Sequence, residues 1–104
     1  MTREMMKFGL ASAAVILFMA GVPAAAYTGE ELAKAAKVGI AEARAIALKA
    51  HPGTITDEEL EKEKGGSGLR YSFDIKSGAV TQEVGVDAQA GAVLENAKEG
   101  PNPD

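Results

Sequence analysis

The chain has 104 residues, no cysteine and a formal net charge of −4 at pH 7. This length allows one small domain, and the lack of cysteine excludes disulfide bonds, so one modest hydrophobic core must stabilise the fold. The acidic balance disfavours nucleic acid as a partner, because a negatively charged surface repels the phosphate backbone.

Residues 1–26 have the composition of a secretory signal peptide. The first seven residues include the positively charged Arg3 and Lys7, and the apolar run Phe8–Ala20 follows them. Three alanines ending at Ala26 supply the small residues that a signal peptidase recognises. We therefore predict cleavage near Ala26 and a periplasmic or secreted mature form. The apolar run is shorter than the roughly 20 residues that cross a bilayer as a helix, so the mature form is not expected to span the membrane. Retention of the run as an anchor stays open as the alternative.

Two helical segments are predicted next. A short N-terminal helix is expected within residues 27–37, where Thr28 and Glu31 have the spacing of a capping box. A second helix is expected over Ile40–Ala50, because its apolar side chains recur at helical spacing and form one stripe that can cover a sheet. The sequence His-Pro-Gly at 51–53 ends it, since proline cannot continue a helix.

The sequence then alternates between apolar and polar residues, which indicates antiparallel strands. One strand is predicted over residues 69–76, a turn at Ser77-Gly78, and a return strand over residues 80–86. An earlier strand is expected over Thr54–Glu63. Its apolar residues Ile55 and Leu60 differ in parity, so they need a β-bulge to share one face of the sheet.

Asp87 follows the return strand on its predicted solvent side. An aspartate there accepts hydrogen bonds from backbone N–H groups just ahead of it, and Gly91 can adopt the positive φ that closes such a turn. A lone carboxylate lacks the partner that catalysis or metal binding requires, so Asp87 is interpreted as a turn residue. A short return strand is expected at Val93-Leu94, and a disordered tail over residues 97–104.

Few side chains offer chemistry. His51 is the single histidine, and without cysteine it has no partners for a zinc site. The acidic residues between Asp57 and Glu63 lack the spaced, glycine-turned loop of a calcium site and are interpreted as a solvated strand face. The glycine-rich loop Gly65–Gly68 is interpreted as a flexible linker, because no lysine or helix follows it. No catalytic, metal-binding or cofactor-binding residue is assigned, and no cofactor is expected.

Neither of the serines near these strands is expected to be a nucleophile. The sequence places no base beside Ser67 or Ser72, so it predicts no catalytic triad and a protein that is not an enzyme.

Three stretches in this order resemble the PepSY family. They are IAEARAIALKAHPG as the helix, LRYSFDI as the first strand of the hairpin, and QEVGVDAQAGAVL as the second strand with its turn. The chain departs from the family pattern at Ala90, where the family usually has threonine. The resemblance defines a PepSY-like domain over residues 38–96. It implies an α+β fold, with a helix packed on a small antiparallel β-sheet, and no catalytic residues to carry over.

Two functions remain open at this stage. Related domains occur in the propeptides of thermolysin-like metalloproteases, so the resemblance implies a protein-binding module that inhibits an envelope protease, or assists its folding, in trans. Another envelope protein could also be the partner. The exposed edge could be that of the Thr54–Glu63 strand or that of the return strand at Val93-Leu94. The first is the favoured contact, because its acidic side chains disfavour pairing with copies of itself and leave it open to a different chain. The alternative is an acidic envelope protein that binds ions or a small ligand without catalysis. Neither the partner nor the oligomeric state follows from the sequence.

Overall fold

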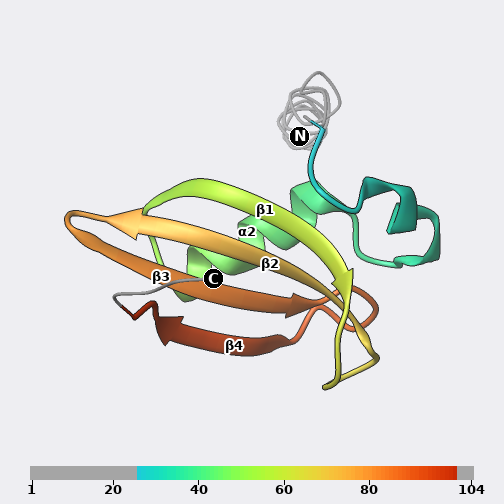
Figure 1. The fold of residues 1–104 in the computed structure, drawn as a ribbon. Coiled ribbons are helices and arrows are strands. Elements are labelled where there is room, and N and C mark those ends of the chain that lie inside the picture. The colour runs from blue at the N-terminus through green and yellow to red at the C-terminus, as the bar shows by residue number, and fades with distance from the viewer. Residues whose placement is uncertain (1–25, 101–104) are drawn as a thin grey trace, which may run out of the picture.

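The structure, a computed structural model, describes residues 26–100 (Figure 1). The elements are η1 (Glu30–Ala35, a 3-10 helix), α2 (Ile40–Ala50), β1 (Thr54–Lys62), β2 (Leu69–Ser77), β3 (Val80–Asp87) and β4 (Val93–Lys98). The strands form one antiparallel sheet in the order β1-β2-β3-β4. The predicted α+β class, with a helix on a small antiparallel sheet, is confirmed. The predicted signal peptide lies outside the described residues, apart from Ala26.

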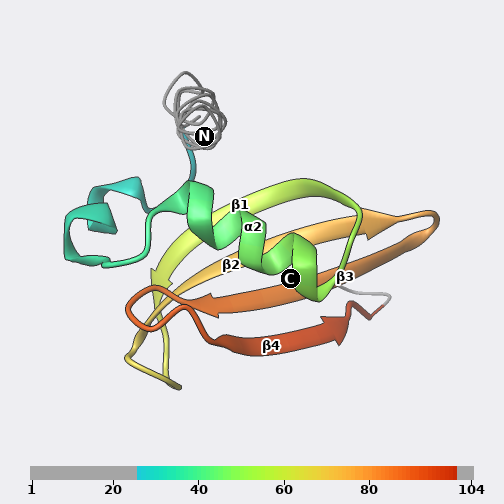
Figure 2. The same ribbon diagram turned by 180° about the vertical axis from the view of Figure 1, so that it is seen from behind.

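Helix α2 covers one face of the sheet (Figure 2). It packs on β2 and β3, and its side chains Ala43 and Ala47 are fully buried. Because alanine is small, the helix backbone can lie close to the sheet, where Phe73 and Val84 are also fully buried. The apolar residues of the alternation predicted for β2 and β3 therefore lie on the face that the helix buries. The opposite face, which we call the open face, is not covered by a helix of the described residues.

A β-bulge in β1 brings its two apolar side chains to the helix side. Ile55 pairs with Ile75 and Leu60 pairs with Tyr71, and the register shifts between Ile55 and Asp57. The extra residue reverses the parity of the strand, so both side chains join the core. The bulge predicted from the sequence is confirmed.

The segment before α2 is fixed to the core by tyrosines. The Tyr71 hydroxyl donates a hydrogen bond to the Val38 carbonyl oxygen at 2.6 Å. Burial raises the pKa of Tyr71 to about 12, so the hydroxyl keeps the proton that it donates. The Tyr27 ring packs against Tyr71 with 6.4 Å between ring centroids. These contacts hold both ends of the segment on the sheet.

The capping box predicted at the start of this segment is wrong. Residue Gly29 precedes η1 with a left-handed φ of 86°, and no side chain caps the helix. A β-carbon at Gly29 would collide with the carbonyl oxygen of Leu60. Close contact with β1 therefore determines this conformation, and only glycine has the required φ and space.

Asp87 turns the chain, but it does so as a buried residue, not on the solvent side. Asp87 is 3% exposed, and its carboxylate accepts hydrogen bonds from the backbone N–H groups of Gln89 at 2.8 Å and Ala90 at 3.4 Å. It also accepts one from the Ser67 N–H at 2.8 Å and one from the Ser67 hydroxyl at 2.6 Å. Gly91 has the expected positive φ of 77°.

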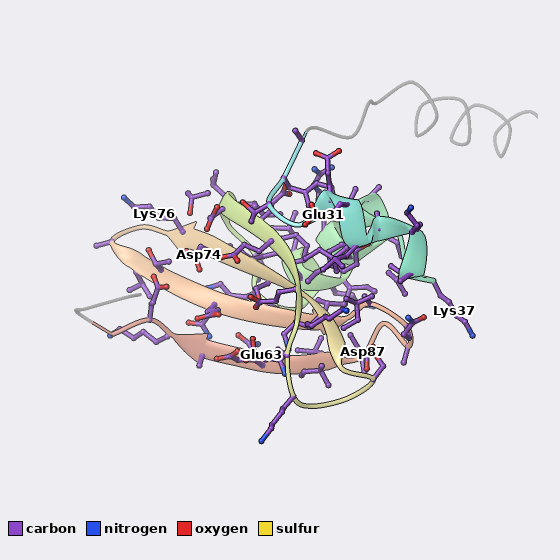
Figure 3. All side chains as sticks on the ribbon, turned by 45° about the vertical axis from the view of Figure 1, so that its right-hand side comes forward. Glu31, Lys37, Glu63, Asp74, Lys76 and Asp87 are labelled. Atoms are coloured by element: carbon purple, nitrogen blue, oxygen red, sulfur yellow. The ribbon has the colours of Figure 1, made fainter. Side chains whose placement is uncertain are left out.

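The bonds from Ser67 change the interpretation of the glycine-rich loop. Gly65–Gly68 was expected to be a flexible linker, yet Asp87 ties it to the end of β3 (Figure 3). At the other end of the chain, β4 continues to Lys98. Residues 97 and 98 therefore belong to a strand and not to a disordered tail, because the backbone of β3 offers them partners. Residues 101–104 lie outside the described residues.

We expect Asp87→Asn to destabilise the fold clearly, because an amide NH₂ group would replace one of the two oxygens that accept hydrogen bonds from Ser67. These bonds lower the pKa of Asp87 to about 2. The unfolded chain binds the proton more readily, so this stabilisation is present above about pH 4 and is lost as the pH falls towards about 2. Thermal melts of both proteins should therefore show a gap at neutral pH that narrows in acid. Glu42→Gln, on the exposed side of α2, is the control. An equal loss of stability in both variants would contradict a stabilising role for the bonds between Asp87 and Ser67.

Candidate functional site

Strand β1 is an edge of the sheet that the chain covers at one point only within the described residues. Thr28 forms a parallel bridge with Glu59, and the Leu60 N–H donates to the Thr28 carbonyl oxygen at 2.8 Å. The Leu60 N–H thus points away from β2. The backbone N–H groups of successive residues point to opposite sides of a strand. Glu58 lies two residues before Leu60, so its N–H also points away from β2. The first half of β1 can therefore accept another strand.

A groove lies along this half of the edge. It is lined by residues 26–28, by Arg44 of α2 and by residues 55–58 of β1. We call this the edge groove. Its volume is ≈ 470 Å³. It has an apolar wall in Ile55 and charged groups in Arg44, Asp57 and Glu58, so an extended peptide would find both kinds of contact.

An ion pair forms the helix side of the groove. Arg44 donates to Glu58 through Nε at 2.5 Å and through Nη2 at 3.0 Å, and the side chains are 23% and 16% exposed. The hydrogen bond to Glu58 raises the pKa of Arg44. The acidic run of β1 was expected to form one solvated face, and for Glu58 this is wrong. Glu58 pairs with Phe73 in the sheet, and this register turns its side chain towards α2.

The remaining acidic residues of β1 lie on the open face with acidic residues of the other strands. They line a hollow of ≈ 360 Å³ together with Ser72. We call the eight carboxylates the acidic face: Asp57, Glu59, Glu61, Glu63, Asp74, Glu83, Glu95 and Glu99. Figure 3 labels two of them, Asp74 on β2 and Glu63 just after β1. Like charges so close together repel one another.

The protonation of the acidic face reflects this crowding. Burial, together with the charges of Glu95 and Asp74, raises the pKa of Glu83 to about 7. Burial, followed by the charge of Asp57, raises the pKa of Asp74. Burial also raises the pKa of Glu61, against the opposing effect of a hydrogen bond from Ser72. These groups therefore hold protons more firmly than ordinary carboxylates do.

A cation would relieve part of this repulsion. One oxygen from each of Asp74, Glu83 and Glu99 lies within 4.8 Å of the others, and carboxylate oxygens are the ligands that calcium prefers. This is the single group of three or more acidic, histidine or cysteine side chains within residues 26–100 that could share an ion. Exposed acidic groups often gather in this way without binding an ion.

Arg70 lies at the end of the open face near the glycine-rich loop. It is 7% exposed. Its guanidinium lies 3.3 Å from Glu95 and 3.7 Å from Glu63, and it donates to the Lys64 carbonyl oxygen at 3.1 Å. Arg70 thus offsets the acidic face at one end only, and the repulsion is greatest around Glu83.

The other residues considered for chemistry are placed apart from one another. His51 directly follows α2, and its backbone N–H donates to the Ala47 carbonyl oxygen. The Ser67 hydroxyl donates to Asp87, and the Ser72 hydroxyl donates to Glu61 at 2.9 Å. The structure thus gives each serine a carboxylate neighbour, on different parts of the sheet.

Sequence reasoning missed both the ion pair and the grouping on the open face. The hairpin register that pairs Asp74 with Glu83 could have been counted from the turn at Ser77-Gly78. Glu99 could not have been found in this way, because β4 was expected to be much shorter. The contact between Arg44 and Glu58 depends on the bulge and on where α2 lies on the sheet.

We expect Glu83 to make the folded protein less stable as the pH rises from about 4.5 to about 7. The folded state holds the Glu83 proton at a pH where the unfolded chain has released it, so the raised pKa favours folding in acid. Glu83→Gln should reduce this slope and stabilise the protein near pH 8 by about 1 kcal/mol or less, since water screens partly exposed charges. Thermal melts across this range measure both effects. Glu42→Gln, on the exposed side of α2, should leave the slope intact.

Comparison with known proteins agrees with this fold. No helix within residues 26–100 is long and apolar enough to cross a membrane. Searches of curated proteins and of solved structures found no significant match. Residues 37–96 match the PepSY family, which is described as a peptidase propeptide and YPEB domain. This match covers α2 and all four strands except the last two residues of β4. The chain therefore belongs to the PepSY family.

Proposed function

We propose that this chain is a non-catalytic protein-binding module that acts in trans on another protein of the cell envelope, with a protease as the first candidate. Membership of a family described as a peptidase propeptide domain supports a module of the propeptide or inhibitor type. Such a module would inhibit the protease or assist its folding. The partner would be a separate chain.

The half-covered edge of β1 is the observation that carries this proposal. Thr28 already pairs with the strand beside Glu59, so the edge accepts a neighbouring strand in the folded protein. The outward N–H of Glu58 lies beside the edge groove, where a further segment could pair. Strand addition at a sheet edge is a recurring way for domains to bind peptides, because the main chain supplies the hydrogen bonds.

We expect a photo-crosslinking amino acid at Thr56 to capture the partner in intact cells. Thr56 is exposed and lines the edge groove. The same amino acid at Ala45, on the exposed side of α2, is the matched control. The captured protein is identified by mass spectrometry. If it is a protease, the purified chain should slow its cleavage of a peptide substrate.

Two outcomes would contradict this proposal. Equal adducts at Thr56 and Ala45 would mean that contact with the edge is not specific. Failure to capture any protein at Thr56, in cells where the variant is folded and expressed, would remove the proposed binding function.

The alternative function is binding of a cation or small ligand on the acidic face. The close approach of Asp74, Glu83 and Glu99 is the observation that favours it. A ligand that binds only the folded state raises the melting temperature. If this alternative is right, calcium should therefore raise the melting temperature of the parent protein and leave that of Glu83→Gln unchanged. If the chain binds only protein, calcium should change neither melting temperature.

We also propose that the chain acts outside the cytoplasm. The positively charged start, the apolar run and the small residues up to Ala26 support export with cleavage near Ala26. N-terminal sequencing of the protein from an envelope or medium fraction should begin at Tyr27 or within a residue or two of it. An intact start at Met1 in the cytoplasmic fraction would contradict export.

A further inference from the structure

The edge groove gives a strand added to β1 two different environments. Side chains alternate between the two faces of a strand, so those of an added segment would lie in turn over the open face and over the helix side. On the open face they would meet Asp57 and Glu59. On the helix side they would meet Ile55 and Tyr27 of the groove.

These environments differ in charge. Asp57 and Glu59 belong to the acidic face, where burial and like charges already raise the pKa of Asp74 and Glu83. A basic side chain beside them would lower the repulsion, whereas an acidic one would add to it. On the helix side Glu58 is already paired with Arg44, so the apolar contacts of this side come from Ile55 and Tyr27.

A second copy of this chain fits the edge poorly. Pairing β1 with β1 of another molecule would place Asp57, Glu59 and Glu61 of both copies along the same side of the joined sheets. Acidic side chains on an edge disfavour pairing of this kind. The charge of the edge therefore selects a different chain.

We propose that the edge groove binds an extended segment of a partner protein in which basic and apolar side chains alternate. The segment adds a strand to the first half of β1, in line with Tyr27–Thr28. Its basic side chains lie on the acidic face, and its apolar side chains lie against Ile55 and Tyr27. This inference rests on the proposed function and names the chemistry of the partner.

The test uses a capped peptide of about six residues in which lysine and valine alternate, a length that covers the first half of β1. Binding to the purified chain is measured by calorimetry and by the rise in melting temperature. We expect binding by this peptide. We expect no comparable binding by a peptide of the same composition with lysines and valines in two blocks, or by one with glutamate in place of lysine.

Two further peptides test backbone pairing directly. One carries N-methyl groups on every lysine and the other on every valine, so each removes the N–H groups of one side of the strand. Only one side faces β1, so one of these peptides should bind at least about tenfold more weakly while the other changes little. Equal binding of both would overturn strand addition.

A matched pair of protein variants locates the site. Asp57→Lys and Glu42→Lys change the net charge equally, but only Asp57 lines the edge groove. Asp57→Lys should weaken binding of the alternating peptide at least about tenfold more than Glu42→Lys does, because the added charge repels the nearest lysine. Equal weakening of binding in both variants would mean that the peptide is attracted only by the net charge of the protein, and would overturn the inference.

The inference and the proposed function fail separately. If the alternating peptide does not bind, the inference is wrong, while a partner captured specifically at Thr56 keeps the proposed function. If the peptide binds as expected and no partner is captured at Thr56, the groove chemistry is right and the proposed function is wrong.

Discussion

The packing of α2 on β2 and β3 is the constraint from which the rest of the structure follows. One helix of this length covers one face of a four-stranded sheet, and Ala43 and Ala47 allow it to lie close. The fold therefore has two layers within the described residues. The buried apolar side chains of β1, β2 and β3 turn towards the helix, so most acidic side chains of these strands lie together on the other face.

This division explains why charge gathers on the open face. The acidic residues of β1 would be separate solvated groups on an isolated strand. Pairing with β2 and β3 brings them beside Asp74 and Glu83, and Arg70 offsets the charge at one end only. The folded chain tolerates this repulsion because the core and the sheet hydrogen bonds hold the strands together. The same repulsion makes the face attractive to basic groups.

The sequence allowed the main elements to be predicted. Helix α2 begins and ends at the predicted residues, because Gly39 and the His-Pro-Gly sequence act locally on the backbone. The bulge in β1 followed from the parity of Ile55 and Leu60. The capping box at Thr28 was wrong because contact with Leu60 forces Gly29 into a left-handed conformation. The length of β4 was missed because β3 supplies its hydrogen bonds, and its own residues are mostly polar.

The sequence by itself thus determined the helix, the hairpin, the need for a bulge and the family, since each depends on neighbouring residues or on a regular period. It also indicated that Asp87 turns the chain. Only the tertiary structure decided that Asp87 is buried and holds Ser67, that Arg44 binds Glu58 beside the edge groove, and that carboxylates from different strands form one face. These contacts join residues far apart in the chain. Their geometry depends on strand register and on where the helix crosses the sheet, and neither is encoded in any one segment.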